Sequence, residues 1–561
     1  MRIKRFDLFC LGIIFAESIV FLFDFFMNPG RFASFDAPFH ITNIAQFANS
    51  LLDGNFPVVW TDRFANYGLP IGIVAHQMTS YLGALFSLLF NDPYMGFKAV
   101  ALIGVAGSAL LYFVFLRLYF SSQVALAGAT LFNLASYRIF NFYVRGALPE
   151  IFSAVFLPLI LIGLYLFIEK KNILGIFLFT ISLFLLTVTH PFMLLIYGLI
   201  YGPYAFFLLS RNNDLKNLIK RGSIKKMLSL GFAFAIGIVS GSFYIIPLSR
   251  EIKYFYYGLN PTNLEPNSFF SLSSFLKFSW PYFTASEVFP RGHIVTLGLL
   301  ELVGLLLGLV LLGFLMRKKI KTAKEALVIF SAITSLVLVF LMTPLSNVLY
   351  TYIPFLNQIQ FPWRMISGLI FLIPIFYCYL LERKNSYILI GVFILLCIGL
   401  RLPELYGKNY TYFPKSSYDK TLINVHSVLM NTIWTGKTED YQVKSQKGEI
   451  IEGKGKILAR SEHISKRQYA VQADGQVRLA DNTFYFPGWK VYVDGVDTSI
   501  EFQDPSYRGV ITYKVPNGDH VVRVVFEDTK IRLVSKAISV VALITIGILF
   551  MLRKRIARII Y

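Results

Sequence analysis

A short segment near residue 36 brings together side chains that could carry out acid–base chemistry. Residues 34–40 read SFDAPFH, and Pro38 begins an amphipathic run that extends to residue 52. Asp36 directly precedes this predicted helix, so its carboxylate could simply cap the helix by accepting backbone N–H bonds. The same carboxylate lies one helical turn from His40 and could instead remain ionised and act as a general base. The residues themselves leave both roles open.

A second segment, residues 143–150, carries both signs of charge. It reads YVRGALPE, which places Arg145 shortly before Glu150 at the start of a long apolar run. An acid in the first turn of a helix is stabilised by the helix dipole, and Arg145 could be its ion-pair partner. The alternative is that Arg145 binds a phosphate, because a planar guanidinium matches phosphate oxygens in a way that lysine does not.

Further polar residues interrupt apolar sequence. His190 stands between Thr189 and a proline, a pattern that is also typical of a simple corner between two helices. Arg364 ends the sequence FPWR at the start of another apolar run, where Trp and Arg often serve as interfacial anchors. Arg250 and Arg364 share with Arg145 the alternative role of phosphate ligand. The candidate binding residues are therefore His40, Arg145, His190, Arg250 and Arg364.

The elements that position these residues must be membrane spans. Of 561 residues, 55% are hydrophobic and only 15% are charged, which excludes a soluble enzyme, a disordered scaffold and a secreted disulfide module. A bilayer core takes about 20 apolar residues per helix. Twelve spans are predicted near residues 6–26, 94–119, 123–141, 147–168, 172–189, 191–209, 228–248, 294–316, 326–344, 365–382, 386–402 and 533–552. The shorter apolar run 78–91 is predicted to be a half-helix or interfacial helix on the outer side.

The net charge of +21 is explained by topology rather than by nucleic-acid binding. Short basic clusters lie between the predicted spans, and assigning them to the cytoplasm predicts a plasma-membrane protein with both termini inside. Three long segments, 27–93, 249–293 and 403–532, are then outside. The candidate residues above all fall on this outer side. Because charged groups are unfavourable at the membrane boundary unless paired or hydrated, we expect one outward-facing cavity to hold them.

Residues 403–532 are predicted to form a separate β-rich domain outside the membrane. Apolar runs there shrink to strand length, as in 489–493 and 521–526. Asp494-Gly495 and Asn517-Gly518 supply the positive φ angles that tight hairpin turns need, which favours a small antiparallel β-sandwich. The predicted organisation is a transmembrane core over 1–402, this domain, and a final anchoring helix with a basic tail over 533–561.

The sequence offers little to a metal ion or a disulfide. Cys10, Cys378 and Cys397 all lie within apolar runs, and no CxxC or His/Cys ligand pattern occurs. The segment 27–93 contains no adjacent Asp-Glu and no Asp-x-Asp pair. We predict no structural metal and no certain cofactor. Glu17, in the middle of the first predicted span, could be neutral or paired with a neighbouring span.

Four motifs together resemble those of a known family. They are Asp36-Ala-Pro-Phe-His40, Arg145-Gly-Ala-Leu-Pro-Glu150, Phe361-Pro-Trp-Arg364 and the segment 486–495, FPGWKVYVDG; residues 54–60 (GNFPVVW) and 67–70 (YGLP) accompany them. Their order is similar to that of the GT-C superfamily of polyprenyl-phosphate-sugar-dependent glycosyltransferases. More narrowly, they resemble the YfhO-like and "6-pyruvoyl-tetrahydropterin synthase-related" bacterial membrane proteins.

This resemblance implies a GT-C fold and sugar transfer with inversion. The donor would be a polyprenyl-phosphate-linked sugar, and the acceptor a glycan, lipid or protein of the cell envelope. Asp36 would take the position of the catalytic base and Glu150 that of a second acid. Arg145, Arg364 and His190 would hold the leaving phosphate. Members of the superfamily differ over a divalent metal, so the resemblance leaves one possible.

Two other functions fit the same pattern. A transporter or flippase of lipid-linked glycans would also need an outward cavity with arginines for phosphate, and a non-catalytic membrane scaffold is the third alternative. A flippase predicts charge along a path through the whole membrane. The inner halves of the predicted spans are poor in ionisable groups apart from Glu17, which favours the enzyme.

Overall fold

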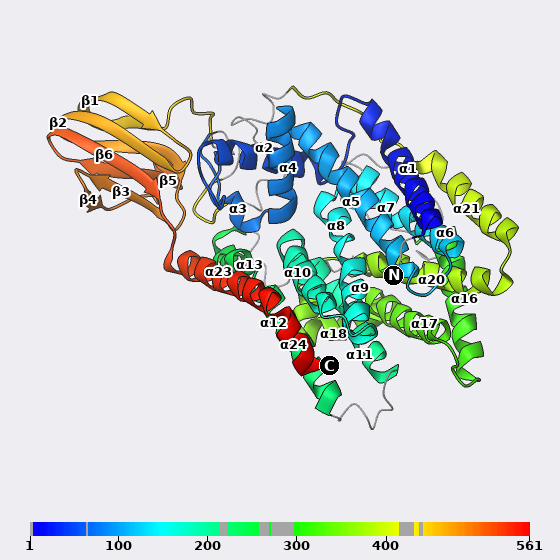
Figure 1. The fold of residues 1–561 in the computed structure, drawn as a ribbon. Coiled ribbons are helices and arrows are strands. Elements are labelled where there is room, and N and C mark those ends of the chain that lie inside the picture. The colour runs from blue at the N-terminus through cyan, green and yellow to red at the C-terminus, as the bar shows by residue number, and fades with distance from the viewer. Residues whose placement is uncertain are drawn as a thin grey trace.

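A bundle of apolar helices carries a β-sheet domain at one end, as Figure 1 shows. The computed structural model describes residues 4–62, 66–211, 221–256, 269–270, 297–414, 431–436 and 441–561. Most of the predicted outer segment 249–293 therefore lies outside the described residues. The protein is a multi-pass membrane protein, and its helices are built from the apolar runs that the composition predicts.

Nine helices of the described chain are long and apolar enough to cross a membrane. A tenth crossing results if α12 (Arg221–Val239) and α13 (Ser242–Glu251), which are bent by 64° at a short break, form one span. The nine are α1 (Arg5–Met27), α5 (Pro93–Leu116), α8 (Leu148–Ser153) with α9 (Phe156–Ile168), α11 (Pro191–Arg211), α16 (Leu299–Met316), α17 (Ala323–Met342), η7 (Pro362–Met365) with α20 (Ile366–Lys384), α21 (Tyr387–Arg401) with η8 (Leu402–Glu404), and α23 (Lys530–Met551).

Two of the twelve predicted spans differ from the prediction. The first, α10 (Leu174–Thr189), has 16 residues, or about 24 Å at 1.5 Å per residue, which is short for a bilayer core of about 30 Å. The second, predicted over 123–141, is divided into α6 (Ser122–Asn133), α7 (Ser136–Ile139) and the π-helix η1 (Phe140–Arg145). At the break, the carboxylate of Glu301 in α16 accepts the Ser136 N–H at 2.9 Å. A distant side chain thus satisfies the backbone where the helix stops.

The first outer segment folds into α2 (Ala37–Leu52), α3 (Ile71–Val74) and α4 (Gln77–Phe90), all packed at one end of the bundle (Figure 1). α4 is the 14-residue apolar helix in the place of the predicted half-helix. It lies very close to α5, because a Cβ on Gly96 would come within 2.4 Å of the Gly83 carbonyl oxygen. Only glycine fits at such a contact. The short elements that complete the helical part are η3 (Ile252–Tyr254), η6 (Pro344–Ser346), α18 (Asn347–Tyr352), α19 (Pro354–Asn357) and α24 (Arg553–Ile560).

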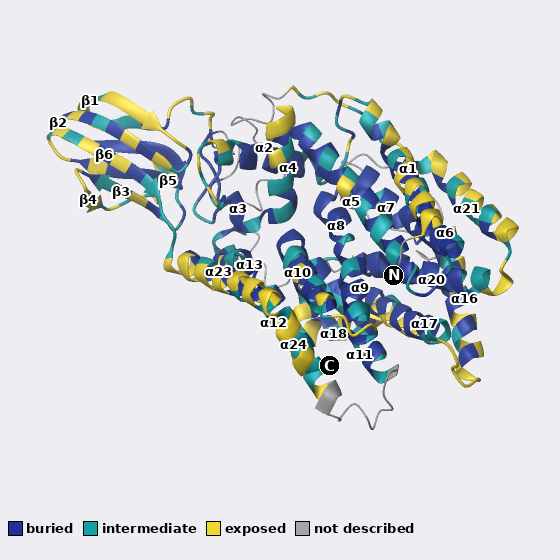
Figure 2. Ribbon diagram, viewed as in Figure 1, coloured by how far each residue is buried: buried dark blue, intermediate teal, exposed yellow. Residues whose placement is uncertain are grey.

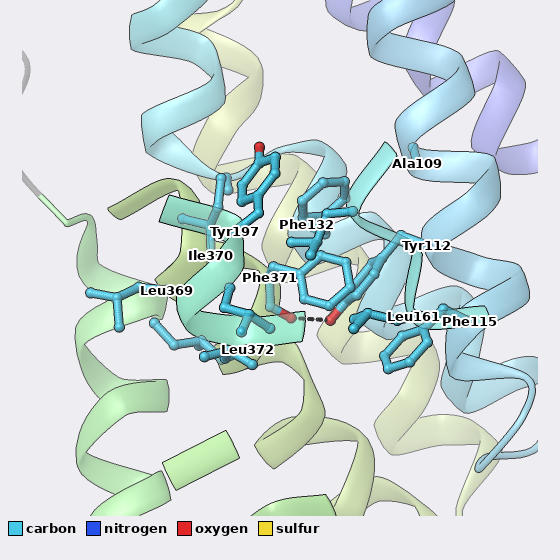
Figure 3. Close-up of a cluster of buried hydrophobic side chains, with 14 of the residues drawn as sticks. Ala109, Tyr112, Phe115, Phe132, Leu161, Tyr197, Leu369, Ile370, Phe371 and Leu372 are labelled. Carbon is cyan, nitrogen blue, oxygen red and sulfur yellow. Dashed lines mark hydrogen bonds between the residues drawn. The ribbon is translucent and has the colours of Figure 1, made fainter. Parts of the chain in front are cut away.

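The bundle core is aromatic and tightly packed. In Figure 3, Tyr112 of α5 donates a hydrogen bond to the Phe371 carbonyl of α20 at 2.5 Å, and the two rings lie 4.4 Å apart. Phe132 of α6 packs on the same tyrosine, with ring centroids 4.6 Å apart. Figure 2 shows buried residues through the middle of the bundle and exposed ones along α1, α21 and α23. Apolar exposed faces on such helices suit contact with lipid.

The C-terminal domain is an antiparallel sheet, which confirms the predicted β-rich domain. Its strands are β1 (Gly448–Glu462), β2 (Lys466–Phe484), β3 (Trp489–Val493), β4 (Val496–Thr498), β5 (Val510–Val515) and β6 (Gly518–Phe526), with the turn η11 (Pro505–Tyr507). The order is β1-β2-β6-β3-β4, and β5 pairs with the second half of β2. The six strands thus belong to one hydrogen-bonded sheet rather than to two. The predicted hairpin turn at Asp494-Gly495 is present, with φ of 50° and 85°, and it joins the paired strands β3 and β4. The hairpin predicted at Asn517-Gly518 is wrong: Gly518 has φ of 119°, but the strands it connects, β5 and β6, pair with different halves of β2 instead of with each other.

Candidate functional site

The corner between η1 and α8 lies directly against the start of α2. Gly146 forms this corner with φ of 65°, and a Cβ there would come within 2.6 Å of the Ala37 side chain. The close contact lets the Asp36 backbone N–H donate to the Arg145 carbonyl at 2.7 Å. The segments 34–40 and 143–150, which are far apart in the sequence, are therefore joined through their backbones, and their charged side chains lie side by side.

Glu150 is the centre of a buried polar cluster at this corner. Its Oε1 accepts hydrogen bonds from the Tyr137 hydroxyl at 2.6 Å and from Asn141 Nδ2 at 2.9 Å. Its Oε2 accepts one from Arg145 Nη1 at 2.7 Å and lies 3.5 Å from Arg364 Nε. The residue is only 3% exposed. Both carboxylate oxygens are thus engaged, and Glu150 holds two guanidinium groups in fixed positions.

Asp36 lies at the outer edge of the cluster and is partly open to solvent. It occupies the N-cap position of α2, yet its side chain makes no capping hydrogen bond. Its Oδ2 lies 3.6 Å from Arg145 Nη2, and 38% of the side chain is exposed. The carboxylate is therefore available to a substrate, and the capping role that the sequence left open is not how the structure uses it.

The two arginines of the cluster are buried beside aromatic rings. Arg145 lies 5.0 Å from the Trp363 ring, and Arg364 lies 4.9 Å from the Phe361 ring. Arg364 is 6% exposed, and its Nε and Nη1 have no hydrogen-bond partner among the described residues. The pair shares one buried carboxylate, so the buried part of the cluster carries an excess of positive charge. Such a site favours an anion with several oxygens.

Three histidines that are far apart in the chain form a row in space beside the arginines. His40 of α2, His76 before α4 and His190 between α10 and α11 form a row, with ring centroids 6.1 Å apart for the first pair and 4.7 Å for the stacked second pair. Burial lowers the pKa of His76 to about 3, and the charges of His40 and Arg364 act in the same direction. Burial also lowers the pKa of His190 well below its ordinary value. Both rings are therefore neutral near pH 7 and can exchange hydrogen bonds but add no charge.

The structure brings together six of the seven candidate site residues and adds three. Asp36, Arg145, Glu150 and Arg364 converge as expected, and the electrostatic contacts of His76 and His190 with Arg364 join the histidine row to them. Arg250 is the exception, because it is exposed near the end of α13 and no contact among the described residues joins it to the cluster. The added residues are His76, Tyr137 and Asn141. The position of His76, just before the predicted interfacial helix and in the same outer segment as His40, was the available signal for that residue.

The described residues supply no set of metal ligands. No group of three or more His, Cys, Asp or Glu side chains within them is arranged to hold an ion. The row of histidines stacks ring on ring instead of converging on a point. The divalent metal that the sequence left open therefore has no candidate ligand set here, and no step below depends on one.

The segments 54–60 and 486–495, which also carry the family resemblance, lie where the first outer segment, the sheet and the last span α23 meet. Trp60, from GNFPVVW, packs edge to face on Trp489, from FPGW, with ring centroids 5.2 Å apart. Arg532 of α23 pairs with Glu251 at 3.0 Å and donates to the Pro487 carbonyl at 2.8 Å. These contacts hold the β domain against the first outer segment (Figure 1). The segments 54–60 and 486–495 thus pack together beside the first outer segment, which carries α2 and Asp36.

Buried polar contacts also tie the first outer segment to the sheet. Lys447 Nζ lies 3.5 Å from Asp62 Oδ1 and donates to the Asn66 carbonyl, and all three residues are buried. Tyr67 stacks on Phe484 with ring centroids 4.8 Å apart. Burial lowers the pKa of Lys447 to about 8. The sheet and the outer segment therefore share one core.

Comparison with known proteins yields only a distant structural similarity. No family model matches the sequence, and no curated protein matches it. A solved structure of the oligosaccharyltransferase from Archaeoglobus fulgidus, in the apo form, is similar with a TM-score of 0.40 and 13% sequence identity. The similarity covers 73% of this chain and 57% of that one, so the chain spans less than two thirds of that protein.

Proposed function

We propose that this chain is a GT-C-like membrane glycosyltransferase that moves a sugar from a polyprenyl-phosphate donor to an extracytoplasmic acceptor. The observation that carries the proposal is the cluster in which a partly exposed carboxylate, Asp36, stands beside two buried arginines. A transferase of this kind needs a base for the acceptor and cations for the leaving phosphate. We also propose that the protein is YfhO-like and that the acceptor is a glycan, lipid or protein of the cell envelope.

The arginines supply the binding site for the leaving phosphate. Arg364 Nη1 has no hydrogen-bond partner among the described residues, while Nε faces Glu150 Oε2 at 3.5 Å. A phosphate placed against the end of this guanidinium could accept hydrogen bonds from Nη1 and Nη2 at once. The neutral rings of His76 and His190 lie within electrostatic reach of Arg364 and offer further hydrogen bonds.

Asp36 acts as the base in the proposed reaction. It takes the proton from an acceptor hydroxyl, and the acceptor oxygen attacks the anomeric carbon of the donor sugar. The bond between that carbon and the phosphate oxygen breaks, and the phosphate leaves with the electron pair, which inverts the anomeric centre. Arg145 links the two halves of the step, because it contacts Asp36 at 3.6 Å and Glu150 at 2.7 Å.

Glu150 serves as a positioning residue in this scheme. Its four neighbours, Tyr137, Asn141, Arg145 and Arg364, occupy both of its oxygens. A carboxylate so engaged is poorly placed to exchange a proton with substrate, and its negative charge balances one of the buried arginines. We therefore revise the role of second acid that the resemblance implies for Glu150.

The proposed topology places this cluster at the outer face. Arg364 and Arg383 lie at opposite ends of the η7–α20 span, about 28 Å apart at 1.5 Å per residue, which matches the thickness of a bilayer core. Basic residues gather around Arg383, as the cytoplasmic ends of spans do. The cluster and the β domain then face outward, and both termini face inward.

A flippase for lipid-linked glycans remains the second candidate, on one observation. Buried polar side chains continue from the cluster region into the bundle: Arg138 lies 3.5 Å from Asn133, which donates to Ser18 at 3.1 Å, and the adjacent Glu17 accepts from Thr130 at 2.7 Å. A transporter could use such a track.

One assay separates the two functions. Purified protein is reconstituted in vesicles with a radiolabelled polyprenyl-phosphate sugar, and both transfer to acceptor and movement of donor between leaflets are measured. Sugar transfer that depends on the protein supports the glycosyltransferase. Donor movement without transfer would refute it and favour the flippase.

A further inference from the structure

A second, cationic site lies at the other end of the η7–α20 span. A cavity of about 620 Å³ opens where α16 ends, α17 begins and α20 ends. Its basic lining residues are Lys318, Lys319, Lys321, Lys324 and Arg383, and its acidic ones are Glu325 and Glu382. Five cations against two carboxylates leave a formal charge of +3 around one cavity. Nothing in the proposed transfer reaction uses these residues.

Both carboxylates of the cavity already have structural partners. Glu325 accepts the backbone N–H groups of Lys321 at 2.9 Å and Thr322 at 3.0 Å, which caps α17. Glu382 accepts hydrogen bonds from Ser121 at 2.7 Å and from Lys324 at 2.6 Å. Within the described chain, Lys324 is thus the one cation of the five that forms an ion pair. Lys318 and Arg383 lie over aromatic rings, and Lys319 and Lys321 are exposed.

Two aromatic side chains, Phe314 and Tyr379, line the cavity beside its charged residues. Lys318 Nζ lies 3.7 Å from the centre of the Phe314 ring, and Arg383 Nη1 donates to the Tyr379 hydroxyl at 3.2 Å. A site for a small hydrated anion has no need of exposed rings, whereas an amphiphile contacts both kinds of surface.

An exposed apolar stripe leads along α16 to this cavity. Leu306, Val310 and Phe314 follow one another at four-residue spacing, so they lie on one face of the helix. Their exposed fractions are 53%, 69% and 43%. The stripe runs within the membrane-spanning part of α16 and ends at the ring that lines the cavity. Hydrocarbon chains can therefore lie beside the helix while a charged group occupies the cavity.

We propose that this cavity binds the phosphate headgroup of an anionic membrane phospholipid whose acyl chains lie along the α16 stripe. Arg383 and the three lysines of the α16–α17 turn contact the phosphate, and Phe314 marks the boundary between headgroup and chains. Basic pockets between membrane helices favour such headgroups. The site is separate from the Asp36 cluster, and it stands whether or not the chain transfers sugar.

The test compares two triple variants of equal charge change. In K318Q/K319Q/K321Q the cavity loses three exposed lysines; in the control K454Q/K456Q/K466Q the β domain loses three exposed lysines. Each protein is purified from micelles that contain equal amounts of phosphatidylglycerol and phosphatidylcholine, and the retained lipid is counted by native mass spectrometry. We expect the wild type and the control to retain phosphatidylglycerol preferentially, and the cavity variant to lose this preference by about tenfold or more.

Two outcomes would overturn the proposal. The first is equal retention of phosphatidylglycerol by the cavity variant and the control, with unchanged thermal unfolding of both. The second concerns the source of the phosphate: inorganic phosphate is added at millimolar concentration during purification. If it removes the lipid from the wild type, the cavity recognises the free anion rather than a membrane lipid; if the lipid stays bound, the assignment holds.

Discussion

Replacement of Asp36 by asparagine is the sharpest test of the proposed chemistry, because the structure predicts that it separates activity from stability. Asn matches Asp in size but cannot take a proton from the acceptor. The Asp36 side chain makes no capping bond and has one ion-pair contact, at 3.6 Å with 38% of the side chain exposed. A partly exposed pair of this kind contributes at most about 1 kcal/mol to stability. Loss of a general base lowers a rate by a factor on the order of 10² to 10⁴.

The assay is sugar transfer from a polyprenyl-phosphate donor by purified protein, with thermal unfolding measured on the same samples. Asp92→Asn is the matched control, because Asp92 is also an N-cap residue of the first outer segment and does accept a capping bond, from the Tyr94 N–H at 2.8 Å. We expect Asp92→Asn to transfer sugar as the wild type does. An Asp36→Asn protein that is folded and as active as the wild type would refute the base assignment and favour the flippase.

Four further predictions follow from other parts of the structure. Arg364→Lys keeps the charge but loses bidentate contact, so KM for the donor should rise more than kcat falls. Glu150→Gln removes the counter-charge of two buried guanidinium groups and should reduce the free energy of unfolding by about 3 kcal/mol or more, seen as a lower Tm. Because burial lowers the folded-state pKa of Lys447 to about 8, the unfolded chain binds more protons above that pH; stability should therefore rise between about pH 8 and pH 10, and a Lys447→Met protein should lack this rise. Cysteine at Ser461 should be labelled from outside intact cells, and cysteine at Lys319 only after permeabilisation; the reverse would invert the proposed topology.

The convergence of the charged residues could be predicted from the sequence for a simple physical reason. Charges at the ends of apolar helices must find partners or water, so Asp36, Arg145, Glu150 and Arg364 had few places to lie other than together. Their pairing could not be predicted. Glu150 meets Asn141 and Arg145 through the π-helix η1, and a π-helix depends on tertiary packing that no local pattern encodes. Arg250, which shares the same residue type and the same predicted side, lies apart because α13 packs against α23 instead.

The number of spans also could not be predicted from the sequence alone, because it depends on contacts between distant residues. The sequence predicts one span over 123–141, yet the helix stops after Asn133 and restarts at Ser136. The partner that makes the break tolerable, Glu301, is far away in the chain and itself pairs with Arg401 at 2.7 Å. A local sequence pattern does not predict a partner that is so distant in the chain. The same holds for Trp60 and Trp489, which lie near opposite ends of the chain and whose contact explains why both motifs are aromatic.

A backbone hydrogen bond between Asp36 and Arg145 ties the proposed base to the proposed phosphate ligand. The Asp36 N–H donates to the Arg145 carbonyl at 2.7 Å, and Gly146 makes this approach possible because a Cβ would collide with Ala37. The backbones that carry the carboxylate and the guanidinium are therefore held at a fixed spacing, which limits how far the two groups can separate. A transferase that must remove a proton on one side of the anomeric carbon and stabilise a phosphate on the other benefits from such rigid spacing, since a misplacement of about 1 Å is enough to slow a reaction severely. A transporter that carries its substrate away from the site has no comparable need, and this rigidity is a physical reason, independent of any resemblance, to favour the enzyme.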